Sequence, residues 1–251
     1  MSAVFNDPTA SADPQRIPAS AQSVALFAMA TLAERRDADT ESHLLRMQGY
    51  IQVLAEAMRA EPALAPLLSA DYVANLVQCV LVYDIGTLAI PERVLLKPGR
   101  YNAEERNIMQ SHTVRGFQAL ERAAQTCGGA DGWLQVAKEM TLSHHEHWDG
   151  QGYPQQLTGS AIPLSARILA VADAYDAMIT HKVYKAGVSH QEAVAQISAQ
   201  RGAQFDPQVV DAFVLRADDI AQVAQRHADT EDDLQRKMDT LAESIAEHVV
   251  M

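Results

Sequence analysis

Cysteine is scarce in this chain of 251 residues, which contains only Cys79 and Cys127. Two cysteines without CxxC spacing supply neither a disulfide framework nor a cysteine metal pair. Cys79 lies in the apolar run LVQCVLVYDIG, where a thiol is expected to pack as a small hydrophobic side chain. The composition therefore excludes a disulfide-stapled fold and predicts a protein of the reducing cytoplasm.

Targeting and membrane-spanning segments are also lacking. The N-terminal stretch MSAVFNDPTASADPQ has no basic region followed by an apolar region, so a secretory signal is not expected. No uninterrupted apolar run reaches the roughly 18–20 residues that a membrane-spanning helix needs. The sequence therefore predicts a protein without a membrane span.

Basic residues are few, with 20 Lys and Arg against 32 Asp and Glu and a net charge of -12 at pH 7. A chain of this charge is not expected to coat DNA, RNA or an anionic membrane. A small phosphate-bearing ligand stays compatible with it, because such binding depends on the local charge. The acidic surplus is concentrated after residue 204, whereas residues 93–122 are mildly basic.

Strand-like alternation and internal repeats are absent, whereas apolar residues recur at the three- and four-residue spacing of helices. The predicted fold class is therefore all-α. Residues 1–20, rich in Ala, Ser, Pro and Asp, are expected to form a mobile leader. Helices are expected from Ala21 onward and over 72–85, 103–124, 131–148, 165–180, 191–200 and 205–214.

The C-terminal residues 216–251 are expected to form an acidic amphipathic helix. An apolar stripe recurs there at helical steps, formed by Leu234, Met238, Leu241, Ile245 and Val249. The stripe suits either docking on the body of the same chain or pairing with a second copy in a homodimer. Both alternatives stay open from the sequence.

Histidines and aspartates suggest a metal site. Imidazole and carboxylate are ligands of divalent iron, manganese and zinc. Asp84 and Asp173 lie in apolar segments, where a carboxylate must be paired, hydrogen-bonded or bound to a metal. Taken singly, each histidine can also be a satisfied structural or surface residue, so the spacing alone does not establish a metalloprotein. The candidate ligands are His43, Asp84, His112, His144, His145 and Asp173.

The segments HHEHWDGQGYP (144–154) and IPLSARILAVADAYDAM (162–178) closely resemble the HD-GYP proteins, a branch of the HD phosphohydrolase superfamily. The similarity extends to RRDADTESH (35–43), YDIGTLAIPERVLLKPG (83–99), IMQSHTVRG (108–116) and GAQFDPQVVDAF (202–213). It implies an all-α HD-domain bundle over residues 21–215, with 216–251 as a C-terminal helical extension. It also implies metal-dependent hydrolysis of cyclic di-GMP to pGpG or GMP in bacterial signalling.

The resemblance implies a role for each matching residue. Asp84 would bridge two metals in the catalytic centre, with His112, His144 and His145 on one of them. His43 and Asp173 complete the ligand set. Asp39 stands where many relatives carry Glu or Asp, of which Glu is the one often associated with a third metal. Gly152, Tyr153 and Pro154 would lie beside the substrate, and Lys182 and Lys185 would grip its phosphates. Iron is the implied ion, with manganese or zinc as alternatives and one or two ions bound. Cyclic di-GMP, as substrate or ligand, and GGDEF-domain or other signalling proteins are the implied partners.

Two residues depart from the HD-GYP pattern. Tyr83 replaces the histidine of the His-Asp pair, and Thr87 replaces the lysine three residues after the aspartate. Tyr83 either packs in the helical core or serves as a phenolate ligand, a role that suits ferric iron better than a ferrous or manganous ion. Two functions follow: a weakened cyclic di-GMP phosphodiesterase, or an inactive module that binds the nucleotide or docks a partner.

Overall fold

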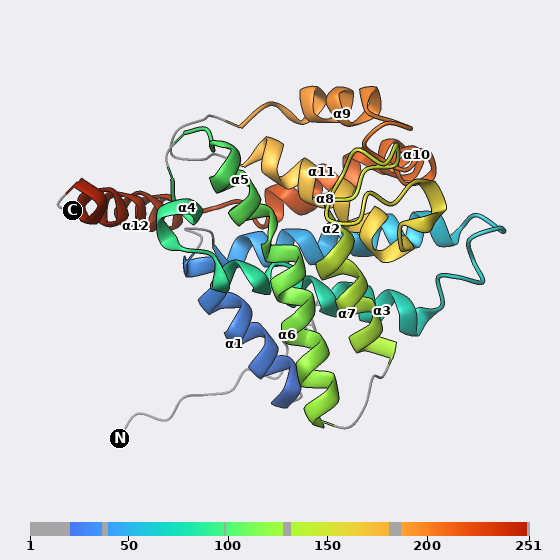
Figure 1. Ribbon diagram of the computed structural model, residues 1–251. Helices are drawn as coiled ribbons and strands as arrows, with labels where there is room; N and C mark the ends of the chain where they lie inside the picture. Colours follow the sequence, from blue (N-terminus) through green and yellow to red (C-terminus); the bar gives the residue numbers. More distant parts are fainter. Residues whose placement is uncertain (1–20, 37–39, 98, 128–131, 181–186, 250–251) are drawn as a thin grey trace, which may run out of the picture.

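The computed structural model describes residues 21–36, 40–97, 99–127, 132–180 and 187–249 as a bundle of helices (Figure 1). Within these ranges the only β-type pairing is an isolated bridge between Arg201 and Phe205. The all-α prediction is therefore confirmed. The expected leader, residues 1–20, lies outside the described ranges.

Helix α2 (Glu41–Arg59) forms the centre of the bundle. It packs against α3 (Ala70–Cys79), α8 (Leu164–Ile179), α10 (Pro207–Leu215) and α11 (Ala217–Arg226). Its fully buried side chains recur every three or four residues, which gives the helix a continuous apolar face: Met47, Tyr50, Ile51, Leu54 and Met58. This central position places His43, near the start of α2, inside the domain.

A second group of elements packs on the side of the bundle. Helix α6 (His112–Cys127) lies against α7 (Gly132–Ser143) and the 3₁₀ helix η2 (Ile85–Ala89). Gly86 makes the contact with α6 possible, since a Cβ there would lie 1.9 Å from the carbonyl oxygen of His112. The close approach brings Asp84, just before η2, beside the first residue of α6.

A smaller apolar cluster lies under α4 (Glu92–Leu95) and α5 (Ala103–Gln110). Its buried members are Ile90, Val94, Leu95 and Leu96. Asn102 and Glu105 form a capping box at the start of α5, in which each side chain bonds the other residue's backbone N–H. The remaining elements are α1 (Ala21–Arg36), the 3₁₀ helices η1 (Val80–Val82) and η3 (Gly159–Ala161), α9 (His190–Ala199) and α12 (Glu231–Val249).

Three predicted helices have wrong boundaries. The segment 72–85 is not one helix: α3 ends at Cys79, η1 follows, and Asp84 separates η1 from η2 with φ -102 and ψ 14. The segment 103–124 is divided into α5 and α6 at Ser111. The segment 131–148 leaves the helix after Ser143. Each boundary brings a candidate metal ligand to a turn or a helix end.

By length and composition, Ala70–Ala89 is apolar enough to cross a membrane, and among the described residues it is the only such segment. Half of it is buried within the bundle. The chain runs there as α3, η1 and η2, so the segment supplies core residues to the fold.

The C-terminal extension forms two helices rather than one. Helix α11 buries Ile220 and Val223 against the bundle, whereas α12 projects from its side (Figure 1). Thr230 caps α12 by accepting a hydrogen bond from the backbone N–H of Asp233. Leu234 is 36% exposed and Met238 50% exposed, so the predicted apolar stripe is not buried on the body at these two positions.

Candidate metal centre

Three histidines converge where α6 begins and α7 ends. His112 is the first residue of α6, and His144 and His145 follow α7 directly. Their ligand nitrogens all lie within 4.8 Å of one another, and His112 Nε2 is 3.4 Å from His144 Nε2. His112 and His144 are each 2% exposed. The structure therefore brings together three of the histidines that the sequence nominated.

Asp84 lies against the same cluster. Its Oδ1 atom is 3.3 Å from His112 Nε2 and 3.4 Å from His144 Nε2. Among the described residues this buried oxygen has no partner that meets hydrogen-bond geometry. A buried carboxylate oxygen in that condition is destabilising unless a proton or a cation lies against it.

The orientation of two imidazoles leaves their lone pairs directed at Asp84. His112 Nδ1 donates to the carbonyl of Met109 at 2.7 Å, and His144 Nδ1 donates to that of Met140 at 2.9 Å. Backbone acceptors of this kind fix the tautomer in which Nε2 is the metal-binding nitrogen. Two Nε2 atoms and a carboxylate oxygen then face one another as acceptors, and a divalent transition metal fits this donor set.

The local electrostatics agree with cation binding. Burial acts to raise the pKa of Asp84, but the contacts with His112 and His144 hold it well below its ordinary value. Burial, reinforced by the charge of His144, lowers the pKa of His145 far below its usual range. His145 is therefore neutral at physiological pH, which is the state that binds metal.

His43, Tyr83 and Asp173 form a second group beside this cluster. The Tyr83 hydroxyl donates to Asp173 Oδ1 at 3.0 Å and shares a hydrogen bond of 3.1 Å with His43 Nε2. The Tyr83 ring is 3% exposed and meets the ring of His144 edge-on at 5.2 Å. Tyr83 thus packs in the core with its hydroxyl directed into the site, between two predicted metal ligands.

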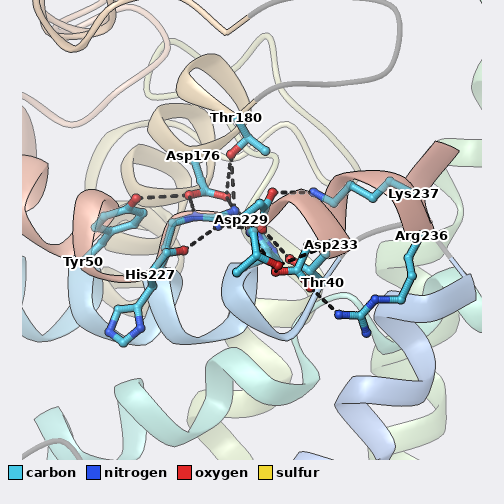
Figure 2. Close-up of polar contacts among 12 residues, drawn as sticks. Thr40, Tyr50, Asp176, Thr180, His227, Asp229, Asp233, Arg236 and Lys237 are labelled. Atoms are coloured by element: carbon cyan, nitrogen blue, oxygen red, sulfur yellow. Dashed lines mark hydrogen bonds and ion pairs between the residues drawn. The ribbon is translucent and has the colours of Figure 1, made fainter.

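Asp176 lies behind His43 and was missed by the sequence prediction. It accepts from His43 Nδ1 at 2.8 Å, from the Tyr50 hydroxyl at 3.1 Å and from two guanidinium nitrogens of Arg46 (Figure 2). Its position three residues after Asp173, on the mostly apolar helix α8, was the available signal. Asp176 fixes the orientation of the His43 ring.

The C-terminal extension reaches this network through Asp229. This carboxylate accepts from Thr40 Oγ1 at 2.7 Å and from Lys237 Nζ at 2.8 Å, and pairs with Arg46 at 3.3 Å (Figure 2). Lys237 is only 6% exposed. A chain of buried polar contacts therefore runs from α12 to His43.

The loop after His145 covers the cluster. Tyr153 stacks on His145 with ring centroids 4.8 Å apart, and the Tyr153–Pro154 peptide bond is cis. Gly152 packs so tightly against the residues after His145 that a Cβ would lie 2.2 Å from the backbone nitrogen of His147. The predicted substrate residues Gly152, Tyr153 and Pro154 do lie beside the histidines.

Glu146 anchors this loop and was also missed. It is 2% exposed and accepts from the backbone N–H groups of Gln155, at 2.6 Å, and Leu157, at 3.0 Å. These bonds tie the loop to the residue that follows the histidine pair. Its place within HHEHW was the available signal.

The remaining predicted site residues are less informative. Thr87 is 4% exposed, and its hydroxyl donates to the Asp84 carbonyl at 2.8 Å, which closes the first turn of η2. Asp39, Lys182 and Lys185 lie outside the described residues.

Comparisons with known proteins agree with this geometry. A family model described as "HD domain" matches residues 31–209. A "Probable cyclic di-GMP phosphodiesterase" from Vibrio cholerae is 43% identical over 210 residues, which are 84% of this chain and 48% of that protein. A "Cyclic di-GMP phosphodiesterase" from the same organism is 44% identical over 206 residues, 82% of this chain and 42% of that protein. The chain thus spans about half the length of these relatives.

A solved structure shows the same fold. It is titled as an HDG"Y"P protein from Bdellovibrio bacteriovorus and aligns with a TM-score of 0.52 and 18% identity. The alignment covers 73% of this chain and 54% of the other. At this identity the likeness extends to the helical architecture alone.

Proposed function

Because this chain belongs to the HD domain family, in its HD-GYP branch, we propose that it binds a divalent transition metal and cyclic di-GMP and retains at most slow hydrolysis of that nucleotide. The observation that carries the proposal is the convergence of His112, His144 and His145 on the unsatisfied Asp84 oxygen, beneath the loop of Tyr153. The two Vibrio cholerae relatives, named as cyclic di-GMP phosphodiesterases, support the choice of nucleotide.

The chain's own residues account for binding better than for catalysis. When bound, the ion supplies a Lewis acid that neutralises charge on a phosphodiester. Asp84 and the three histidines would hold it, and Tyr153 stacks on one of these histidines. Lys182 and Lys185 would contact the phosphates. Thr87 cannot supply the cation that a lysine brings to this position, and losing one such donor typically costs about 10²–10³ in rate.

Iron is the ion that we propose, on the basis of the resemblance to HD-GYP proteins, and manganese or zinc suits the same donors. We propose a cytoplasmic location, where a chain that binds the signalling nucleotide cyclic di-GMP would meet its ligand. We also propose that Leu234 and Met238, half exposed on α12, pair two copies in a homodimer. Sedimentation should then show a dimer for the wild type and a monomer for Leu234→Glu/Met238→Glu.

The test measures metal content, nucleotide affinity and turnover on the same purified chain. Wild-type protein reconstituted without oxygen should bind metal and cyclic di-GMP, with slow release of pGpG or GMP. The double variant Tyr83→His/Thr87→Lys should turn over strongly, since it restores both missing groups. His144→Ala is the negative control and should lose metal and turnover together. Wild-type protein with neither metal nor metal-dependent hydrolysis would contradict the proposal.

An inactive binding module is the second candidate, favoured by the joint presence of Tyr83 and Thr87 beside an intact Gly152–Pro154 loop. In that case the chain binds cyclic di-GMP, or docks a GGDEF-domain or other signalling protein, without cleaving the nucleotide. Calorimetric binding with no product after prolonged incubation would select this function. Robust wild-type turnover would exclude it.

A further inference from the structure

We infer that the Tyr83 hydroxyl closes the second metal position and that the chain holds a single ion, bound by Asp84, His112, His144 and His145. The inference rests on the proposed function, because it assumes that the histidine cluster binds metal. It decides between the two roles of Tyr83 that the sequence left open: the phenol is a hydrogen-bonding substitute for an ion, and not a ligand.

The Tyr83 hydroxyl lies between the side chains of His43 and Asp173. Tyr83 Oη lies 3.1 Å from His43 Nε2 and 3.0 Å from Asp173 Oδ1, and hydrogen bonds join it to both. These two side chains are the predicted ligands that the resemblance does not place on the metal of His112, His144 and His145. The hydroxyl therefore satisfies the imidazole and the carboxylate that an ion in this position would coordinate.

The polar atoms around Tyr83 and those in the neighbouring histidine cluster differ in their hydrogen-bond partners. Around Tyr83, both ring nitrogens of His43 and the Oδ1 atom of Asp173 make hydrogen bonds of ordinary length. Beside it, Asp84 Oδ1 is buried without such a bond. Buried polar groups that already have partners gain little from a cation, whereas an unsatisfied carboxylate oxygen gains a great deal. The two positions differ in their need for an ion.

Packing in the core fixes the position of the Tyr83 phenol. The Tyr83 ring is 3% exposed, belongs to the main apolar core and meets His144 edge-on at 5.2 Å with an interplanar angle of 87°. On the opposite side, His43 is fixed by the bond from its Nδ1 to Asp176. Neither side chain can turn away to admit an ion without disturbing the core.

A phenol and an imidazole at position 83 differ in what they offer to a metal ion. A metal in this position would have to displace a hydroxyl that is already hydrogen-bonded to both side chains. Imidazole in the same place would add a ring nitrogen as a ligand. Ferrous, manganous or zinc ions therefore occupy the histidine cluster alone. Asp84 serves one ion instead of bridging two.

Metal counting tests the inference without reference to activity. Chains loaded with manganese or iron(II) without oxygen, then desalted and analysed by elemental mass spectrometry, should contain one ion per wild-type chain. Tyr83→His should contain two. Tyr83→Phe removes the hydroxyl and keeps the ring, so it should still contain one, and His112→Ala should contain none. Circular dichroism and melting curves verify that each variant is folded.

Spectroscopy provides an independent measurement. After oxidation to iron(III), the wild-type protein should lack the visible charge-transfer band of an iron–phenolate bond. Two ions in the wild type would overturn the inference, and so would a phenolate band that Tyr83→Phe abolishes. Either result would leave the proposed metal binding intact. A wild-type chain without any ion would instead reject the proposed function itself. The two failures are therefore distinguishable.

Discussion

Arg46 and Asp176 form a bidentate ion pair in the interior of the bundle. Arg46 Nε donates to Asp176 Oδ1 at 2.7 Å and a terminal nitrogen donates to Oδ2 at 2.9 Å, with both side chains 3% exposed. Burial acts against the charge of Asp176, but His43 and Arg46 hold its pKa well below the ordinary value. The pair is charged and shielded from water, so each member depends on the other.

A variant that lacks one partner of this pair should be less stable to unfolding and should keep its metal. Asp176→Asn leaves the buried Arg46 guanidinium with the longer ion pair to Asp229, at 3.3 Å, as its remaining counter-charge. We expect a loss of about 3–5 kcal/mol in the free energy of unfolding. Urea titration measures the change. Metal content at the histidine cluster should stay as in the wild type, since the predicted metal ligand that Asp176 bonds is His43, which lies outside that cluster.

The matched control is the exposed pair of Arg201 and Asp211, which has the same bidentate form with both distances at 2.8 Å. Asp211→Asn should leave the unfolding transition where it is, because water and salt screen an exposed pair. Equal effects of the two substitutions would contradict the importance of burial. Loss of metal in Asp176→Asn would instead place His43 among the ligands.

The close approach of η2 to α6 predicts that Gly86 cannot be replaced by alanine. The added Cβ would lie 1.9 Å from the His112 carbonyl oxygen and 2.7 Å from the Gly116 nitrogen, and both are backbone atoms that cannot step aside alone. We expect Gly86→Ala to separate Asp84 from His112, which should lower the metal affinity at least about tenfold and destabilise the fold.

Gly132→Ala is the control for this substitution. Its Cβ would meet only the Asn75 side-chain nitrogen, at 3.7 Å, at the start of α7. Alanine is the better helix former, so stability should be unchanged or slightly higher. Metal titration followed by thermal melting compares the two variants. A Gly86→Ala protein with wild-type affinity would show that the contact is not needed to form the site.

The Glu146 carboxylate should control nucleotide binding more than metal binding. Glu146→Ala removes the acceptor of the Gln155 and Leu157 backbone N–H groups, which frees the loop that carries Tyr153. We expect weaker cyclic di-GMP binding by about tenfold, equivalent to about 1.4 kcal/mol. Calorimetry gives the affinity and elemental analysis the metal content.

Glu139→Ala serves as the comparison, because Glu139 is a carboxylate on α7 that accepts from Ser165 on α8 and from Gln135 on its own helix. It should leave the nucleotide affinity near the wild-type value. Parallel losses of metal and nucleotide in Glu146→Ala would mean that Glu146 supports the histidines rather than the loop.

The attachment of α12 should weaken in acid. Burial acts to raise the pKa of Asp229, but Lys237 and Thr40 lower it below its ordinary value of 3.8. A carboxylate whose pKa is depressed by folding contributes stability that is complete above 3.8 and is lost as the pH falls through the folded value. The contribution of Asp229 should therefore be constant at neutral pH and decline below about pH 4.

Urea titrations of the wild type and Asp229→Asn between pH 7 and pH 3 measure this contribution. The difference in unfolding free energy should be constant over most of the range and shrink at its acid end. Asp233→Asn is the neighbouring comparison for the loss of a cap on α12. A difference in unfolding free energy that grew as the pH fell would contradict a lowered pKa of Asp229 in the folded state.

Local sequence patterns predicted the helices, because helical periodicity depends on residues close together in the chain. The resemblance to HD-GYP proteins predicted which histidines cluster. Spacing could not reveal which ligands meet which. Asp84 contacts His112 and His144 only because Gly86 admits α6, and Arg46 meets Asp176 across 130 residues. The helix predicted over 72–85 failed because hydrophobicity alone does not register the 3₁₀ turns around Asp84.

Buried carboxylates were the other limit. The sequence shows at most that Glu146 and Asp176 lie beside predicted site residues, and only the folded chain shows that these two and Asp229 each receive several donors. The role of Tyr83 was open for the same reason. An aromatic residue in an apolar segment predicts packing, whereas the direction of its hydroxyl depends on His43 and Asp173, which are distant in the chain.

The hydroxyl between His43 and Asp173 has an evolutionary consequence. Each tyrosine codon differs from a histidine codon by one base, and this chain already carries His43, Asp173 and Asp176 around position 83. A single base change at codon 83 would therefore complete the ligand group that the HD-GYP resemblance implies. The genetic distance between the one-ion and the two-ion form of this site is one base.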